Sequence, residues 1–312
     1  MSGRTYRVAC LAGNGVGPEL MAEASRALVE VARFHGFEVE ERHVPFGSEA
    51  LSRSGHPLPL ATRAAYLQAD AVLVAIAGEP ALDDVESELD LRASATRVAF
   101  GPGCEVTLLS PLADDLAGWT VDRAFEVACA GRARLASVGA DGRWRELVDA
   151  VAGRYDGVEV EHLTVSAGMP ALAFEPERFD VVVTGPLFGD ALATVLASIE
   201  REARVVARGR LAGNAPGVFS PGHEGAPDIA GQGVADPSSM LLATALMLGE
   251  GLGERAAAAT LAGAVTGTRR GRAPALDSVL AGVTSATRHF TDAVLSELQV
   301  AITNAEFRDA RR

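Results

Sequence analysis

The chain combines short apolar runs with amphipathic stretches, and the two patterns alternate from its first residues. Positions 6–11 are mainly apolar and end at a glycine-rich turn, whereas Leu20 and Val31 in the stretch 18–35 keep helical spacing. Positions 71–77 are apolar throughout, which is typical of a strand buried in a parallel sheet. The pattern therefore predicts a strand, a glycine turn and a helix, followed by a buried parallel strand.

The same criteria extend to the rest of the chain. Strands are predicted at 37–43, 106–110, 158–165 and 179–184, and helices at 57–68, 122–130 and 144–153. From residue 238 onward the chain is predicted to be helical, in the segments 240–248, 254–265 and 285–298. We find no internal repeat, low-complexity linker or charge block that interrupts this order.

Length and charge narrow the class of protein. The chain has 312 residues and a net charge of -13, so one large α/β domain or two lobes with a substantial core are expected. The acidity excludes nucleic acids and anionic membranes as favourable partners. No apolar run reaches about 18 residues, and the first residues lack the apolar segment of a signal peptide. The three cysteines are scattered without metal-ligand spacing, which suits a reducing cytoplasm.

The absence of one residue type constrains the chemistry more than the overall composition does. All 28 basic residues are arginine, and the chain contains no lysine. Arginine stays protonated in proteins, so it is a poor general acid and does not form a Schiff base. Any mechanism that needs a lysine of this chain is therefore excluded, whether or not a codon bias explains the composition.

One polar, glycine-rich stretch near the start of the C-terminal helices has the composition of a ligand loop. Residues 223–233 read His-Glu-Gly-Ala-Pro-Asp-Ile-Ala-Gly-Gln-Gly, and we refer to them as loop 223–233. Small residues let backbone approach a flat ligand closely, and Asp228 can accept hydrogen bonds from a ribose. Pro237 suits the first turn of the next helix, because its missing amide would have no helical partner there. An ordinary surface loop that caps a helix is the alternative interpretation.

This loop resembles the adenine-nucleotide loop of the isocitrate/isopropylmalate dehydrogenase family, which runs roughly His-Gly-Ser-Ala-Pro-Asp-Ile-Ala-Gly. The turn 13–19 is similar to the family's Gly-Asp-Gly-Ile-Gly-Pro-Glu opening, with Asn14 in place of the aspartate. The resemblance implies an α/β fold: a two-lobed, open, mostly parallel sheet flanked by helices, with a cleft between the lobes. It assigns 1–99 plus 212–312 to the nucleotide-binding lobe and 100–211 to the second lobe, through whose helices relatives form homodimers.

The resemblance also implies a set of site residues. The cofactor-binding candidates are His223, Gly225, Ala226, Pro227, Asp228, Ile229 and Asp236. An acidic residue at the position of Asp228 goes with NAD in the family, so NAD is the cofactor implied. Arg92 lines up with the arginine of the family's substrate helix, so the resemblance implies a helix at 89–97 in which Arg92 holds a carboxylate. A solvated helix arginine without a ligand is the alternative interpretation. Asp190 stands where relatives have the first of two metal-binding aspartates.

Several family groups have no counterpart in this chain. Thr194 replaces the second of those aspartates and Ser166 a third, so Asp190 is a remnant and we expect no bound divalent metal. Ser110 stands for a substrate arginine, and neither the catalytic lysine nor the tyrosine is matched. The family's metal-dependent oxidative decarboxylation is therefore predicted to be absent. Glu224 in place of a glycine, and Asp236 in place of an asparagine that pairs with adenine, also count against nucleotide binding.

Three functional hypotheses remain open. The first is a pseudoenzyme that binds a small molecule or an adenine nucleotide and has an accessory or regulatory role. Such a protein could also bind a protein partner. The second is an enzyme with a rebuilt pocket. Its catalytic candidates are Asp190, Arg92, His223, Asp114 and Asp115. The third is a residual NAD-dependent 2-hydroxy-acid dehydrogenase, an oxidoreductase of the family type, against which the missing lysine counts.

Overall fold

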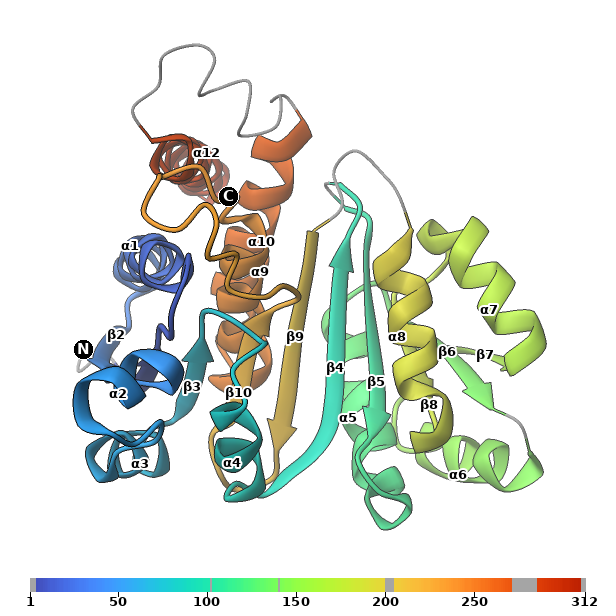
Figure 1. The fold of residues 1–312 in the computed structure, drawn as a ribbon. Helices are drawn as coiled ribbons and strands as arrows, with labels where there is room; N and C mark the ends of the chain where they lie inside the picture. The colour runs from blue at the N-terminus through green and yellow to red at the C-terminus, as the bar shows by residue number, and fades with distance from the viewer. Residues whose placement is uncertain (1–3, 102, 140, 200–204, 271–284, 310–312) are drawn as a thin grey trace.

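The structure is a computed structural model that describes residues 4–101, 103–139, 141–199, 205–270 and 285–309. One ten-stranded sheet runs through the molecule in the order β2-β1-β3-β10-β9-β4-β5-β8-β6-β7 (Figure 1). The strands are β1 (Thr5–Leu11), β2 (Glu38–His43), β3 (Ala71–Val74), β4 (Leu91–Ala99), β5 (Glu105–Pro111), β6 (Arg134–Gly139), β7 (Glu159–Thr164), β8 (Val181–Thr184), β9 (Val205–Ala212) and β10 (Gly217–Pro221). Pairing of these strands is parallel except at β10–β9, β9–β4 and β4–β5, so the predicted mostly parallel sheet is confirmed.

Helices cover both faces of this sheet. They are α1 (Gly17–His35), α2 (Gly47–Ser54), α3 (Leu60–Leu67), α4 (Ala81–Ser87), α5 (Ala117–Ala130), α6 (Gly142–Ala152), α7 (Val165–Phe174), α8 (Gly189–Ser198), α9 (Ser238–Leu246), α10 (Arg255–Arg270) and α12 (Ala286–Asp309). A π-helical turn, η4 (Met247–Gly251), continues α9, and the short 3-10 helix η1 (Asp114–Leu116) precedes α5. Among the described helices, none combines the length and apolarity needed to cross a bilayer.

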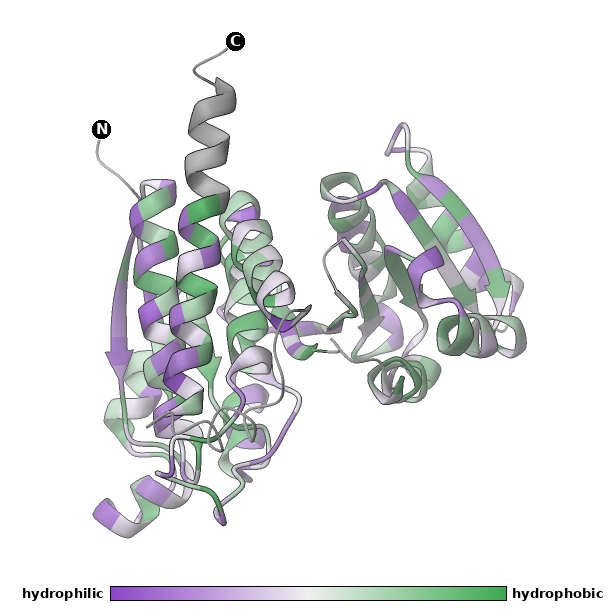
Figure 2. Ribbon diagram, turned by 90° about the horizontal axis from the view of Figure 1, so that it is seen from above, coloured by the Kyte–Doolittle hydropathy of each residue, from purple (hydrophilic) through white to green (hydrophobic). Residues whose placement is uncertain are grey.

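The alternation of side chains along the strands divides the core between the two faces. Val8 of β1 packs on the face covered by α1, α5, α9 and α10, whereas Ala9 points to the face covered by α2, α3 and α4. On the far half of the sheet, Leu192 and Leu196 of α8 pack with Leu172 of α7 on a separate core cluster. Figure 2 shows these two helix-covered halves, joined by the central strands.

The centre of the sheet is where the chain crosses between its halves. β4 and β9 lie side by side and antiparallel, with β10 on one side and β5 on the other. The lobe boundaries expected from the sequence, at 99/100 and 211/212, fall at the ends of these two strands. The division into lobes itself stays a prediction.

One expected helix is wrong. The segment 89–97, predicted as a substrate helix with Arg92 on it, is mostly the strand β4. Ala93 and Ala95 are buried on the α1 and α5 side, and the polar Ser94 between them faces the other side. This period of two fits a central strand, and the tertiary packing of small residues outweighs the helix expectation that the family motif carried.

Candidate functional site

Loop 223–233 lies at the carboxyl ends of three parallel strands, which is where α/β sheets bind their ligands. β1, β3 and β10 run parallel and end at the turn 12–17, at Ala77 and at the loop itself. The amide of Val16 donates to the carbonyl of Gly225 over 2.7 Å, and the amide of Ala77 donates to that of His223 over 3.1 Å. A Cβ on Gly15, whose φ is +57°, would lie 1.9 Å from the Gly225 oxygen. The two glycine-rich segments are thus in backbone contact.

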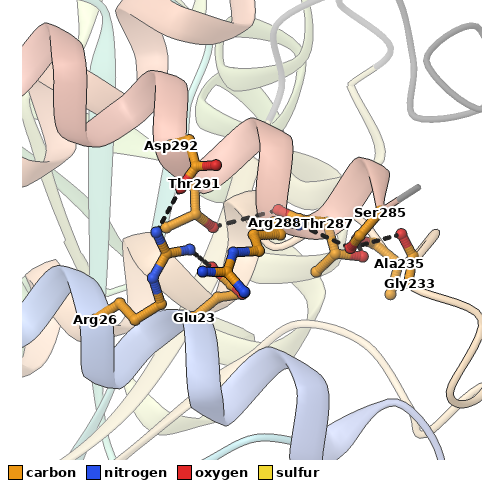
Figure 3. A network of polar contacts seen from close by, with 9 residues as sticks. All are labelled: Glu23, Arg26, Gly233, Ala235, Ser285, Thr287, Arg288, Thr291 and Asp292. Carbon is orange, nitrogen blue, oxygen red and sulfur yellow. Dashed lines mark hydrogen bonds and ion pairs between the residues drawn. The ribbon is translucent and has the colours of Figure 1, made fainter. Parts of the chain in front are cut away.

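The far end of the loop is fastened by α12 and α1. The Gly233 carbonyl accepts hydrogen bonds from the Thr287 amide at 3.0 Å and the Ser285 hydroxyl at 3.3 Å (Figure 3). The Thr287 hydroxyl donates to the Ala235 carbonyl over 2.7 Å, so the first turn of α12 also holds the segment that follows the loop. Arg26 of α1 forms ion pairs with Glu23 and with Asp292, which join α1 to α12 behind these contacts.

The candidate cofactor residues differ in how free their polar groups are. The carboxylate of Asp228 is exposed, and its backbone carbonyl accepts a hydrogen bond from the Gln232 side-chain amide at 2.8 Å. The His223 ring nitrogen Nδ1 lies 3.0 Å from the Glu224 carbonyl, an arrangement in which Nδ1 donates. Ala226 has a φ of +37°, a strained conformation for a residue with a Cβ before Pro227, and such strain is concentrated at ligand loops.

Asp236 has a structural role that the sequence did not indicate. One carboxylate oxygen accepts from the Ser238 amide at 2.9 Å at the start of α9, and the other forms an ion pair with Arg269 of α10. Burial opposes its ionisation, but the Arg269 charge and the Ser238 hydrogen bonds outweigh that effect and lower the pKa of Asp236. Ionised Asp236 thus joins α9 to α10.

α4 and α8 flank one face of the central strands (Figure 1). Residues of this face line a pocket of about 360 Å³. Its floor follows from strand register. Ser220 of β10, Arg208 of β9 and Thr96 of β4 are direct neighbours in one row, and Val218, Arg210 and Ser94 form the next. Ala77, which holds the loop, lines the same pocket. Ala77 therefore connects the pocket to the loop, whose own residues are not part of the described lining.

The electrostatics of the pocket are set by two arginines that the sequence analysis missed. The Nε atom of Arg210 lies 3.2 Å from a carboxylate oxygen of Glu86 on α4. Burial raises the pKa of Glu86, although the Arg210 charge works against this. Arg208 is exposed and has no ion-pair partner among the described residues. The described lining carries the guanidinium groups of Arg208 and Arg210 and the carboxylate of Asp190, and because Arg210 is already paired with Glu86, Arg208 is the group that a small anion would contact first.

Of the family's metal residues, Asp190 and Thr194 line this pocket. They lie on the first turns of α8, and both are exposed. The Thr194 hydroxyl donates to the Asp190 backbone carbonyl over 2.8 Å and so is engaged within the helix. Ser166, at the position of the third family aspartate, lies on α7, where its hydroxyl is 3.1 Å from that of Thr164. Within the part of the chain that the structure describes, the pocket thus presents one carboxylate.

The remaining catalytic candidates lie elsewhere. Arg92 binds Asp90 at 2.8 Å and packs over the Trp119 ring at 5.6 Å, and it does not line the pocket that contains Asp190. Asp114 and Asp115 are exposed on η1 and do not line it either. The structure therefore does not bring Arg92, Asp114 and Asp115 together with Asp190 in this pocket.

The position of the absent family arginine is filled by packing. Ser110 is buried on β5, and its hydroxyl donates to the Gly185 carbonyl over 3.3 Å. A Cβ on Gly189 would lie 2.3 Å from the same hydroxyl, so the start of α8 sits directly on this residue. A long side chain at position 110 would not fit beneath α8 in this arrangement.

The chain is similar to known proteins along most of its length. The family model for isocitrate/isopropylmalate dehydrogenase matches residues 7–96 and 121–294. The 3-isopropylmalate dehydrogenase of Synechococcus sp. (strain CC9605) is 34% identical, with 89% of this chain and 91% of the relative covered. That of Bacillus anthracis is 30% identical over 94% of this chain and 97% of the relative.

Solved structures show the same fold at lower identity. The beta-decarboxylating dehydrogenase of Thermococcus kodakarensis superimposes with a TM-score of 0.79 at 23% identity, covering 96% of this chain and 98% of its own. The isocitrate dehydrogenase of Methylococcus capsulatus gives a TM-score of 0.71 at 21% identity over 94% and 99% of the two chains. On the family model and the relatives together, the chain belongs to the isocitrate/isopropylmalate dehydrogenase family.

Proposed function

We propose that this protein binds an NAD-type dinucleotide on loop 223–233 and a compact anion in the adjoining pocket, without catalysing metal-dependent oxidative decarboxylation. The observation that carries the proposal is the pair Arg208 and Arg210 on the pocket floor, next to the loop. Membership of the family supports the part of the proposal that concerns NAD binding. A protein that binds both ligands without this catalysis could serve in the accessory or regulatory role expected from the sequence.

The residues of the pocket do not fit a divalent metal. Mg²⁺ prefers several hard oxygen ligands, usually including more than one carboxylate or substrate phosphate. Here Asp190 is the single carboxylate of the described lining, and the Thr194 hydroxyl is already donating to a backbone carbonyl. The Arg208 and Arg210 guanidinium groups would repel a cation bound beside them. We therefore derive no catalytic step through a metal.

The groups that move protons in the family's chemistry are also absent from the described lining of the pocket. All three tyrosines of the chain are placed elsewhere, since their hydroxyls bond carboxylates in other parts of the fold: Tyr6 to Glu254, Tyr66 to Glu88 and Tyr155 to Asp122. Burial is the main cause that raises the pKa of each phenol, for Tyr155 to about 12. The chain has no lysine, and arginine does not exchange a proton readily near neutral pH.

The loop supports a preference for NAD over NADP. The exposed carboxylate of Asp228 can accept hydrogen bonds from ribose hydroxyls and would repel a 2′-phosphate. Arg269, which the fold brings to the end of the loop, is already paired with Asp236 and offers less charge to a phosphate. Glu224 packs against Gly78, with its Cγ 3.0 Å from where a Gly78 Cβ would lie, and so is directed to the backbone after β3.

A homodimer is part of the proposal. Relatives dimerise through helices of the second lobe, as the sequence resemblance implies. Leu187, directly before α8, is 82% exposed, and Phe174 at the end of α7 is 78% exposed. Exposed apolar side chains mark an association surface where they form a contiguous patch, and we propose that these two residues belong to such a patch. Val195 and Ile199, on and directly after α8, are half-buried and pack against the core cluster beneath that helix.

A second candidate function is an enzyme with a rebuilt pocket. The observation that favours it is that Asp190 shares the pocket with Arg208 and Arg210. A carboxylate can take a proton from a substrate that two guanidinium groups hold in place. In this candidate function the same anion binds in the pocket but is converted to a product, so only an assay of turnover separates it from the first candidate.

Calorimetric titration of NAD and of malonate, a compact dianion, tests the proposal. Arg208→Gln should weaken malonate binding by about 10- to 150-fold, because a hydrogen bond to a charged group contributes about 1.5–3 kcal/mol. NAD binding to the same variant should change little. Arg53→Gln, which removes an exposed arginine of α2, is the matched control.

Two results would reject the proposal. One is that neither NAD nor malonate binds the wild-type protein at millimolar concentration. The other is that Arg208→Gln and Arg53→Gln bind malonate as tightly as wild type, which would place the anion elsewhere.

A further inference from the structure

A second group of ligand-type side chains lies away from the pocket, at the outer edge of the sheet. β2 is the edge strand, and its His43 is in register with Cys10 of the neighbouring β1. Side chains alternate along a strand, so Glu41, two residues before His43, lies on the same face. One ligand atom from each of Cys10, Glu41 and His43 lies within 4.8 Å of the others.

The polar atoms of this cluster are incompletely satisfied. Glu41 Oε2 is 3.4 Å from His43 Nε2, but the buried Oε1 has no hydrogen-bond partner among the described residues. The Cys10 sulfur lies 3.9 Å from the Val8 carbonyl, a long contact for a weak donor. A buried carboxylate oxygen without a partner costs free energy, so this group is short of one interaction.

Charged residues on an edge strand often serve only to discourage pairing with another chain. Glu40 and Arg42 fit that role, since they are largely exposed, lie on the opposite face and pair with each other at 3.3 Å. Glu41 does not fit it, because its side chain is only 16% exposed and faces the buried Cys10. His43 is 52% exposed and leaves the cluster open to solvent.

We propose that Cys10, Glu41 and His43 bind a borderline-soft divalent cation such as Zn²⁺, with water at a fourth position. A thiolate, an imidazole and a carboxylate together select Zn²⁺ or Co²⁺ over Mg²⁺ and Ca²⁺, which take oxygen ligands. Tetrahedral zinc bonds of about 2.0–2.3 Å place neighbouring ligand atoms roughly 3.3–3.6 Å apart. The Glu41–His43 separation of 3.4 Å already matches, and the Cys10 sulfur, within 4.8 Å of both atoms, would have to move closer to bind.

The charges of the cluster balance for a divalent cation. The Cys10 thiolate and the Glu41 carboxylate carry one negative charge each, and neutral His43 carries none. Burial raises the pKa of the Cys10 thiol, so the metal-free protein keeps this proton and metal binding releases it to solvent. The bound cation would also neutralise the Glu41 carboxylate, whose buried Oε1 has no hydrogen-bond partner among the described residues, and tie the edge strand β2 to β1.

Titration of Co²⁺ into the EDTA-treated full-length protein tests this site. The expected result is one equivalent bound, with a near-ultraviolet thiolate-to-cobalt charge-transfer band and the intense visible bands of a tetrahedral ion. Binding should release about one proton for each Co²⁺, measured in weakly buffered solution. Co²⁺ bound without a charge-transfer band would overturn the proposal, because Cys10 would then not be a ligand.

Variants assign the ligands. Cys10→Ser should abolish the charge-transfer band, and His43→Gln should weaken Co²⁺ binding by at least about tenfold. His43 is exposed, so its variant should fold even if a change at the buried Cys10 does not. Cys129→Ser, at an exposed cysteine of α5, is the matched control and should keep the band. Loss of the band in Cys129→Ser, or full affinity in His43→Gln, would overturn the assignment.

Discussion

Replacing Gly15 by alanine should disturb the position of loop 223–233 more than it disturbs the fold. Gly15 has a φ of +57°, which costs an alanine about 1 kcal/mol. Its new Cβ would lie 1.9 Å from the Gly225 carbonyl oxygen, a backbone atom that cannot rotate away. The turn and the loop must separate, and the 2.7 Å hydrogen bond from Val16 to Gly225 is lost, at about 1 kcal/mol. The expected destabilisation is about 2 kcal/mol.

Gly36→Ala is the matched control. Gly36 ends α1 with a φ of +76°, but no heavy atom lies within 4 Å of the place that an alanine Cβ would take, so only the conformational cost of about 1 kcal/mol applies. Urea unfolding of both variants measures the difference, and calorimetry measures NAD binding. Gly15→Ala should lose roughly tenfold in NAD affinity and Gly36→Ala none. Equal stability and equal NAD affinity in the two variants would refute the docking of the loop on the turn.

Three further outcomes are expected. The lowered pKa of Asp236 means that its carboxylate stabilises the fold at pH values above the ordinary aspartate pKa, and that this stabilisation is lost as the pH falls through the lowered pKa. Asp236→Asn should therefore make the free energy of unfolding less dependent on pH in the acid range, as measured by unfolding at a series of acid pH values. Leu187→Asp should yield monomers by light scattering, whereas Leu60→Asp, also at a leucine 82% exposed, should not, and a wild-type monomer at micromolar concentration would contradict the dimer. Asp228→Ala should remove the preference for NAD over NADP in parallel titrations, and an unchanged preference would count against the ribose contact.

Many of the strands and helices along the chain, and the loop, could be foreseen because each rests on local patterns. The glycine-rich turn 13–19 and loop 223–233 carry the family resemblance, and apolar runs such as 71–77 are read directly from hydropathy. Arg92 shows the limit of this reasoning, since a two-residue motif match suggested a helix where small alternating residues form β4. A matching motif aligns residues with those of the family, but the packing of neighbouring residues determines whether the segment is a helix or a strand.

The residues of the pocket and of the edge cluster depend on contacts between distant parts of the chain. Arg208 meets Thr96 and Ser220 only because β9 lies antiparallel between β4 and β10. The alternation of arginine with small or apolar residues around Arg208-Gly209-Arg210 could have indicated a strand, but it could not have shown which strands lie beside it. Cys10 and His43 are brought together by a parallel crossover through α1, so a search for metal ligands at short sequence spacing does not detect them.

The most direct test of the proposed loss of function is NADH formation by protein that calorimetry has shown to bind NAD. Isopropylmalate or isocitrate is supplied with NAD and either Mg²⁺ or Mn²⁺, and the reaction is followed by NADH fluorescence with and without EDTA. A single carboxylate beside two arginines in the described lining, with neither lysine nor tyrosine there, predicts no NADH above the blank in any of these mixtures. Turnover that EDTA abolishes would contradict the proposal and restore the family's metal chemistry to this chain.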